Sequence, residues 1–292
     1  MIDSNSIVFL SGEYKPLASA MVSVMDRGFL FGDGVYEVIP VFGNSIFRKA
    51  EHLARLDNSL SSINIRNPYN TGEWEHIFDE ILKSNASSGD RALYVQVTRG
   101  TGEREHLYSE LLEPTAFVMC KQVPERNYGA GISVVTHEDI RWQYCHIKAI
   151  TLLANVLMKQ YALQTDGSEE TILIRDGVVT EGSQSNVFIV NNGVISTPEK
   201  DQTILPGITR DLAIELIHTS GIPFKETEIR ELELNSAEEI WIMGSTIGIA
   251  PVIKLNGNPV GVGVPGKLWL RINGLYEEFK AGVSNQNDVS VS

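Results

Sequence analysis

Residues 35–48 read VYEVIPVF-GN-SIFR. Two β-prone runs, 35–42 and 45–48, are separated by Gly43-Asn44, which predicts a β-hairpin. A further strand is predicted at 91–98, where apolar and polar residues alternate. The N-terminal part of the chain therefore contains sheet-forming segments that are joined by a tight turn.

Helical patterns are interspersed among these strands. Apolar residues at helical spacing predict one helix over 53–63 and another over 71–85. In the second half, short strands and turns alternate with helices that are expected to begin near residues 151, 206 and 265. Hairpins with interspersed helices predict an α+β fold rather than a doubly wound parallel sheet.

The length of 292 residues and the hydrophobic content of 42% allow two domains with cores of ordinary size. Residues 122–131 contain a proline and two glycines without periodicity and are expected to form the linker. We therefore expect a small N-terminal α+β domain at 1–121 and a larger C-terminal α+β domain at 132–281. Residues 282–292 are small and polar and are expected to form a flexible tail.

The formal net charge of −13 argues against nucleic acid and anionic membranes as partners. Residues 1–10 lack the basic region of a signal peptide, and no apolar stretch approaches the roughly 20 residues that span a bilayer. Cys120 and Cys145 have no zinc-type spacing, so no metal site is expected. Two reduced cysteines are typical of a cytoplasmic protein.

One lysine lies in a segment suited to covalent chemistry. Lys148 is the only ammonium group in the stretch DIRWQYCHIKAI, residues 139–150. A lysine that is kept out of water more readily presents a neutral, nucleophilic amine, which a Schiff base with an aldehyde cofactor requires. A surface lysine whose stem lies along apolar neighbours is the other interpretation.

A cofactor with an aldehyde, a phosphate and a pyridine ring also needs an acid at its ring nitrogen and donors for its phosphate. Glu181 in TEGSQSN, residues 180–186, could be the acid. The phosphate could be bound at the helix start GIT, residues 207–209, by GST at 244–246, or by Arg55. Each of these residues also fits an ordinary cap, a turn or a solvated side chain.

Four separated motifs occur in a characteristic order. They are DRGFLFGDGVYE (26–37), DIRW with Lys148 (139–148), VTEGSQSNVF (179–188) and LPGITR (205–210). In order and spacing they resemble the class IV, or fold type IV, pyridoxal-phosphate aminotransferases over nearly the whole chain. The resemblance implies a two-domain α+β fold with the cofactor at the domain interface, and a homodimer.

The resemblance also implies roles for individual residues. It implies that Lys148 binds pyridoxal 5′-phosphate and carries the reaction, and that Glu181 is the partner of the pyridine nitrogen. The residues that it assigns to the phosphate are Arg55, Ile208, Thr209, Ser245 and Thr246.

The loop RGTGEREH, residues 99–106, discriminates between members of the family. Its Arg104 and His106 resemble the carboxylate trap of bacterial D-amino acid aminotransferases, in which the loop reaches in from the partner subunit. A guanidinium and an imidazole can converge on one α-carboxylate, and Tyr36 can donate a third hydrogen bond. A solvated polar loop is the other interpretation.

This resemblance predicts transamination between a D-amino acid such as D-alanine and 2-oxoglutarate, which gives a 2-oxo acid and D-glutamate. An aminodeoxychorismate lyase and an L-branched-chain amino acid aminotransferase are the alternatives within the family. A non-catalytic protein that binds the cofactor is the alternative from another class. The lyases lack the Arg-x-His pair, which favours the transaminase.

Overall fold

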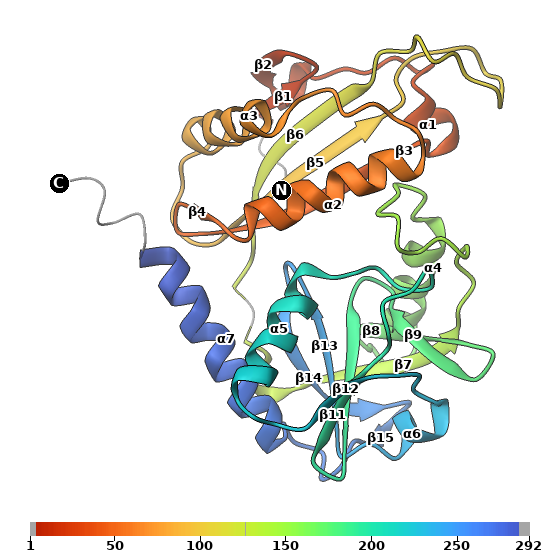
Figure 1. The fold of residues 1–292 in the computed structure, drawn as a ribbon, viewed down its shortest axis with the longest axis vertical. Helices are drawn as coiled ribbons and strands as arrows, with labels where there is room; N and C mark the ends of the chain where they lie inside the picture. The colour runs from red at the N-terminus through yellow and green to blue at the C-terminus, as the bar shows by residue number, and fades with distance from the viewer. Residues whose placement is uncertain (1–3, 126, 286–292) are drawn as a thin grey trace. The chain divides into compact units, whose positions relative to one another are not determined.

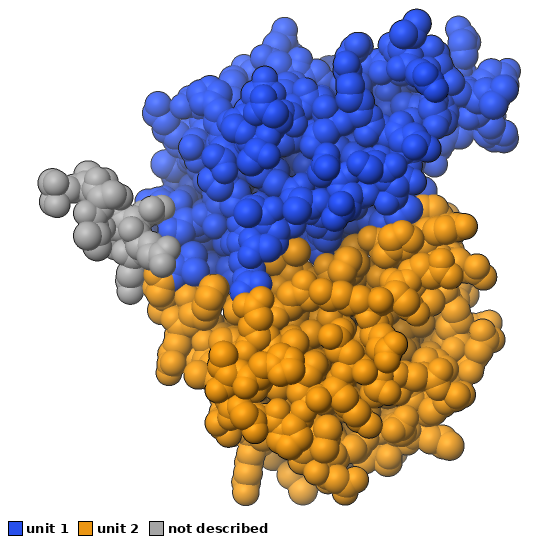
Figure 2. Space-filling model, viewed as in Figure 1, with its two compact units in different colours: residues 1–124, 147–151, 283–292 blue, residues 125–146, 152–282 orange. Residues whose placement is uncertain are grey.

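The structure is a computed structural model that describes residues 4–125 and 127–285. The chain divides into two compact units, which Figure 2 shows in different colours. Unit 1 comprises residues 1–124, 147–151 and 283–292, and unit 2 comprises residues 125–146 and 152–282.

Unit 1 contains a sheet and several helices. Their bounds are β1 (Ile7–Leu10), β2 (Glu13–Pro16), η1 (Leu17–Ser19), α1 (Arg27–Phe31), β3 (Gly34–Phe42), β4 (Ser45–Ile46), α2 (Lys49–Ser62), α3 (Thr71–Ser84), β5 (Arg91–Thr98) and β6 (Thr115–Gln122). The strand order is β2-β1-β6-β5-β3-β4, and neighbouring strands are antiparallel. α2 packs on β3, and α3 packs on β1 and β6 (Figure 1).

Local sequence explains these elements. β3 and β4 pair across Gly43, whose φ of 59° suits a glycine, so the predicted hairpin is confirmed. α3 begins with a capping box between Asn70 and Glu73. Both predicted helices are confirmed, and α2 begins earlier than expected, at Lys49. Leu56, Leu60, Trp74 and Phe78 are buried from the two helices in one core with β3, β5 and β6.

The glycines of residues 28–34 permit close backbone packing, as their density in the sequence indicates. Gly32 ends α1 with a φ of 69°. A Cβ atom on Gly28 would overlap Thr98 Cγ2, and one on Gly34 would lie 2.6 Å from the carbonyl oxygen of Val97. The helix α1 itself was not predicted, because five residues are too few to show a helical period.

Residues 147–151 belong to unit 1 although the chain on both sides of them belongs to unit 2. Tyr36 N–H donates to the carbonyl of Lys148 at 2.9 Å, and Ile150 N–H donates to the carbonyl of Gly34 at 3.1 Å. The segment thus pairs with β3 beyond the end of β4. The domain boundaries expected from the sequence, at 121 and 132, did not anticipate this insertion and stay predictions.

Unit 2 contains the second sheet and its helices, except that residues 283–285 at the end of the last helix belong to unit 1. Their bounds are η2 (Tyr128–Ala130), β7 (Ile132–Glu138), α4 (Leu153–Gln164), β8 (Glu170–Arg175), β9 (Val178–Gly182), β10 (Asn186–Asn191), β11 (Val194–Thr197), α5 (Ile208–Thr219), β12 (Phe224–Glu226), α6 (Glu231–Asn235), β13 (Glu239–Gly244), β14 (Gly248–Leu255), β15 (Asn258–Pro259) and α7 (Lys267–Asn285). The strand order is β12-β11-β10-β13-β14-β7-β8-β9, and β15 pairs with β14.

This sheet is mixed. β14 and β8 run parallel to β7, and β12 runs parallel to β11, whereas the other pairs are antiparallel. α4 packs on β7 and β8, α5 on β13 and α6 on β9 (Figure 1). Sheets and helices in both units confirm the α+β class and rule out a doubly wound parallel sheet.

The C-terminal helix differs from its prediction at both ends. The sequence predicted a start at 265 and a tail from 282, but α7 begins at Lys267 and continues to Asn285. The helix thus extends into residues 282–285 of the expected tail, and residues 286–292 lie outside the described part of the chain. Within residues 4–125 and 127–285, no helix is long and apolar enough to cross a membrane.

Candidate functional site

Lys148 is held at the edge of the sheet of unit 1. Its carbonyl accepts from Tyr36 N–H, and its own N–H donates to Ser59 Oγ of α2 at 3.3 Å. Its side chain is half-buried, and Nζ lies 4.2 Å from the centroid of the Tyr36 ring. The structure therefore brings together Lys148 and Tyr36, and their roles stay predictions.

Arg55 of α2 is buried against Glu37 of β3. Arg55 Nε donates to Glu37 Oε1 at 2.7 Å, and Nη2 donates to Oε2 at 2.8 Å. Arg55 is 7% exposed, so the solvated interpretation of this residue is wrong. Side chains alternate between the faces of a strand, so Glu37 points toward α2 on the face opposite to Tyr36.

His52 completes this group on α2. Its Nδ1 lies 2.8 Å from Glu37 Oε2, and its buried Nε2 has no hydrogen-bond partner among the described residues. Burial raises the pKa of Glu37, but Arg55 and His52 outweigh burial and hold that pKa well below its usual range. Burial lowers the pKa of His52 by more than Glu37 raises it. Glu37 is thus the anion that fixes the Arg55 guanidinium.

Arg104 and His106 lie on the exposed loop that follows β5. Arg104 Cζ is 5.0 Å from the centroid of the Phe31 ring, and the ring centroids of His106 and Phe31 are 5.8 Å apart. The structure therefore brings these two predicted carboxylate ligands to one aromatic ring. Tyr36, the third predicted ligand, stacks on Tyr94 with 5.9 Å between ring centroids.

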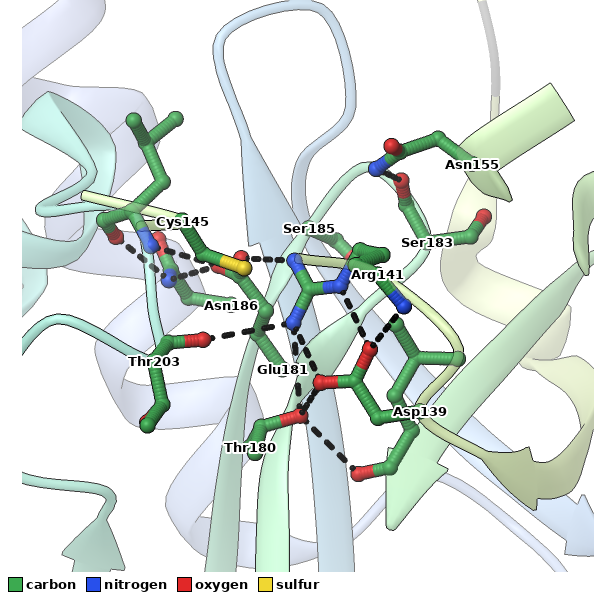
Figure 3. Close-up of polar contacts among 12 residues, drawn as sticks. Asp139, Arg141, Cys145, Asn155, Thr180, Glu181, Ser183, Ser185, Asn186 and Thr203 are labelled. Atoms are coloured by element: carbon green, nitrogen blue, oxygen red, sulfur yellow. Dashed lines mark hydrogen bonds and ion pairs between the residues drawn. The ribbon is translucent and has the colours of Figure 1, made fainter. Parts of the chain in front are cut away.

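Glu181, the predicted partner of the ring nitrogen, is buried near the end of β9 in unit 2. Its Oε1 accepts a hydrogen bond from Arg141 Nη1, and Oε2 accepts from Asn186 Nδ2 at 3.1 Å and from Leu205 N–H at 3.0 Å (Figure 3). Glu181 is 5% exposed, so a solvated turn residue is the wrong interpretation.

Arg141 links Glu181 to a second buried carboxylate. Its Nε and Nη2 each donate to Asp139 at 2.9 Å, and Thr180 Oγ1 donates to the same carboxylate at 3.0 Å (Figure 3). Burial lowers the pKa of Arg141, but the two carboxylates outweigh burial and raise it well above its usual range. Burial likewise raises the pKa of Asp139, and Arg141 holds it below its usual value. Arg141 therefore stays charged beside Glu181.

The start of α5 has no side-chain cap among the residues that the structure describes. Gly207 is the N-cap of this helix. Thr209 Oγ1 is buried without a hydrogen-bond partner among the described residues, so Thr209 is not an ordinary cap. Asn186 Nδ2, which binds Glu181, also donates to the Leu205 carbonyl at 2.9 Å. One amide side chain therefore ties Glu181 to the segment that leads into Ile208 and Thr209.

Ser245 and Thr246 lie in the turn between β13 and β14. Ser245 is half-buried and Thr246 is exposed, and the N–H of Ile247 closes the turn on the Gly244 carbonyl at 3.1 Å. β13 is the strand on which α5 packs. The phosphate role of these two residues stays a prediction.

Four residues that share the polar contacts were given no role from the sequence. Glu37 follows Tyr36 directly, His52 lies one helical turn before Arg55, and Arg141 and Asn186 stand inside quoted motifs. The spacing of His52 and Arg55 places both side chains on one helical face, and this spacing could have indicated a role for His52. The residues of these contacts that the sequence did not indicate are therefore Glu37, His52, Arg141 and Asn186.

The residues present fit pyridoxal phosphate. The unpaired hydroxyl of Thr209 and the first N–H groups of α5 are donors that suit a phosphate. Glu181 offers a carboxylate to a ring nitrogen, and Lys148 offers an amine to an aldehyde. An α+β chain with this set of donors has the groups that a pyridoxal-phosphate enzyme requires.

Comparison with known families agrees. The family model described as "Amino-transferase class IV" matches residues 34–255. The chain therefore belongs to the class IV aminotransferases and is a pyridoxal-phosphate-dependent aminotransferase.

Two curated relatives illustrate the similarity. A D-alanine aminotransferase of Bacillus licheniformis is 39% identical over 263 residues, which cover 89% of this chain and 92% of the relative. A D-alanine aminotransferase of Staphylococcus aureus (strain COL) is 36% identical over 275 residues, which cover 93% of this chain and 97% of the relative.

Solved structures show the same fold. The branched-chain amino acid aminotransferase from Escherichia coli superposes with a TM-score of 0.87 at 23% identity, covering 97% of each chain. The branched-chain aminotransferase of Thermoproteus uzoniensis with norvaline superposes with a TM-score of 0.86 at 25% identity, covering 96% of each chain. At this identity the likeness to the Escherichia coli enzyme concerns the fold alone.

The Glu37–Arg55 pair predicts an acid-sensitive contribution to stability. The folded pKa of Glu37 is depressed, so its stabilisation is present above the ordinary pKa of 4.5 and is lost as the pH falls below it. Glu37→Gln should lower stability near neutral pH by about 3–5 kcal/mol, because it leaves Arg55 buried without its counterion. Thermal unfolding at several pH values measures the difference in stability between wild type and Glu37→Gln. This difference should become smaller in acid.

The matched control is Glu75→Gln, which removes a half-exposed ion pair between Lys49 and Glu75. This variant should change stability little at any pH. A gap between wild type and Glu37→Gln that is constant from neutral to acid pH would contradict the assignment.

A second prediction concerns Arg141. Arg141→Lys keeps the charge but cannot bind Asp139 and Glu181 together through a planar fork. Losing charge-assisted hydrogen bonds to Glu181 should lower kcat by about tenfold to a hundredfold. Arg175→Lys is the control, because Arg175 contacts the same Asp139 at 2.8 Å and otherwise donates to the carbonyls of Arg141 and Trp142. Equal effects of the two variants on kcat would argue against a specific role for the Arg141–Glu181 pair.

Proposed function

We propose that the chain catalyses transamination between a D-amino acid such as D-alanine and a 2-oxo acid such as 2-oxoglutarate, giving a 2-oxo acid and D-glutamate. The observation that carries the proposal is the pairing of Arg104 and His106 around Phe31 on an exposed loop. The D-alanine aminotransferases at 39% and 36% identity support it.

We assign the cofactor contacts as the residues of each unit suggest. When bound, pyridoxal phosphate supplies an aldehyde that takes up amino groups and a ring that withdraws electrons from the neighbouring carbon. Lys148 Nζ binds the aldehyde, and Glu181, paired with Arg141, holds a proton at the ring nitrogen. The phosphate is assigned to Arg55, Ile208, Thr209, Ser245 and Thr246.

Lys148 also moves the proton on which the reaction depends. As a neutral amine, Lys148 Nζ would be the base that removes the hydrogen from the α-carbon of the bound amino acid. Arg104 and His106 bind the α-carboxylate, with Tyr36 as a third donor. Because the carboxylate is fixed, these side chains decide which enantiomer presents its α-hydrogen to Lys148.

The assembly and the location belong to the same proposal. We place the enzyme in the cytoplasm as a homodimer. Cys120 and Cys145 are free thiols, which suits a reducing compartment. Leu107 and Leu111, on the loop of Arg104, are 89% and 88% exposed, which favours cover by a second chain.

The absorbance spectrum of the purified protein tests the reaction. The band of bound pyridoxal phosphate should change when D-alanine is added and should not respond to L-alanine or L-leucine. Lys148→Ala is the control and should show no turnover.

Other outcomes point elsewhere. A response to L-leucine alone would contradict the roles of Arg104 and His106 and favour the branched-chain activity. Release of pyruvate from aminodeoxychorismate without an amino acceptor would favour the lyase. The absence of any cofactor band after cofactor is added would contradict the assignment of Lys148.

Arg104→Ala tests the carboxylate contact directly. Loss of a charge-assisted bond should raise the KM for D-alanine by about tenfold to a hundredfold, while the bound cofactor is unchanged. Glu105→Ala, at an exposed neighbour on the same loop, is the control and should leave KM near the wild-type value. Loss of the cofactor from Arg104→Ala would be inconsistent with a contact to substrate alone.

A further inference from the structure

The stretch Asp26-Arg27-Gly28 has no part in the proposed reaction, yet it contacts the loop between β5 and β6 at several points. Asp26 Oδ2 accepts from Thr98 Oγ1 at 3.0 Å and from Thr115 Oγ1 at 2.7 Å. Thr98 ends β5 and Thr115 begins β6, so one buried carboxylate joins both ends of the loop that carries Arg104 and His106.

The backbone of the same stretch holds the first part of the loop. Arg27 N–H donates to the Gly100 carbonyl at 2.9 Å, and Gly102 N–H donates to the Met25 carbonyl at 3.2 Å. A Cβ atom on Gly28 would overlap Thr98 Cγ2, so glycine permits this close approach. The loop therefore leaves β5 along a fixed path.

The Arg27 side chain holds the loop at the two predicted ligands. Nη1 donates to the Glu105 carbonyl at 2.6 Å, and Nη2 lies 3.4 Å from the His106 carbonyl. Arg27 is 4% exposed, and its Cζ lies 4.7 Å from the centroid of the Phe31 ring that Arg104 and His106 also contact. The guanidinium thus binds the peptide groups on both sides of His106.

Asp33 fixes the orientation of this guanidinium. Arg27 Nε donates to Asp33 Oδ2 at 2.9 Å, and Arg99 donates to both oxygens of the same carboxylate at 2.8 and 3.0 Å. Burial raises the pKa of Asp33, but Arg99 and Arg27 outweigh burial and lower it. Because Nε of Arg27 is bound to Asp33, the two Nη atoms of the same guanidinium are directed at the carbonyls of Glu105 and His106.

From this geometry we infer that Arg27 is a positioning residue for substrate binding, which holds the Glu105 and His106 carbonyls so that Arg104 and His106 can meet an α-carboxylate. The inference rests on the proposed function, because Arg27 has this purpose only if those two side chains bind the substrate. Arg27 acts through the loop, so its loss should affect KM more than kcat.

The test is a double-mutant cycle on the full-length enzyme loaded with pyridoxal phosphate. Arg27→Gln should raise the KM for D-alanine by about tenfold, the loss of roughly one or two hydrogen bonds. The kcat should stay within about twofold, and bound cofactor should be unchanged. In an Arg104→Ala background the same substitution should raise KM by less than about threefold, because the side chain through which it acts is gone.

Arg66→Gln is the matched control. Arg66 is exposed and donates to Glu113 Oε2 at 2.6 Å, so its loss removes an arginine contact at the other end of the same loop. This variant should leave KM unchanged. If Arg66→Gln raises KM as much as Arg27→Gln does, the effect belongs to the loop in general and the inference is overturned.

The outcomes separate the two proposals. If Arg104→Ala raises KM and Arg27→Gln does not, the proposed function stands and this inference fails. If the effects of Arg27→Gln and Arg104→Ala multiply independently, the inference also fails. If Arg104→Ala leaves KM unchanged, both proposals fail. Should Arg27→Gln lose its cofactor or unfold at a much lower temperature, Arg27→Lys replaces it and must show the same split between KM and kcat.

Discussion

The guanidinium of Arg141 is the interaction on which the polar arrangement of unit 2 depends. Asp139 and Glu181 are both buried, and two carboxylates removed from water repel each other unless a cation compensates them. Arg141 donates to both and satisfies them through one planar group. Glu181 can therefore be an anion inside the protein, where a ring nitrogen would meet it without competition from water.

The same constraint shapes unit 1 with different residues. Glu37 is fully buried and anionic, and Arg55 meets it through two parallel hydrogen bonds. A buried pair of this kind adds little net stability, because desolvation offsets most of the attraction. Its value lies in geometry, since a guanidinium held on one edge by a carboxylate has a fixed direction for its remaining donors. Asp33 likewise fixes the orientation of the Arg27 guanidinium, because it accepts a hydrogen bond from Arg27 Nε.

The elements were predictable where periodicity and turn chemistry decide the structure. The hairpin at Gly43-Asn44, the two helices after it and the strand β5 follow from local pattern alone. α1 escaped prediction because it is too short to show a period. The partners of Arg55 and Glu181 were not predicted for another reason. Glu37 and Arg141 contact them across strands and turns, and such contacts depend on tertiary packing that local sequence does not encode.

The prediction that Lys148, Glu181 and Thr209 act together rests on the order and spacing of several motifs and not on any one residue. Burial rules out a solvated side chain for Arg55 and for Glu181. The hydroxyl of Thr209 has no hydrogen-bond partner among the described residues, which rules out an ordinary helix cap. Arg104 and His106 are different, because they are exposed and their proposed partner is the carboxylate of a substrate.

The pairing of residues 147–151 with β3 has a consequence for synthesis of the chain. The ribosome synthesises the strands of unit 1 before it reaches residue 147. The edge of β3 at Gly34 and Tyr36 therefore lacks its partner segment during this part of translation. Exposed strand edges invite pairing with other chains. The segment that contains Lys148 therefore also closes that edge, and the nascent chain gains this protection against misassembly only when the segment has been synthesised.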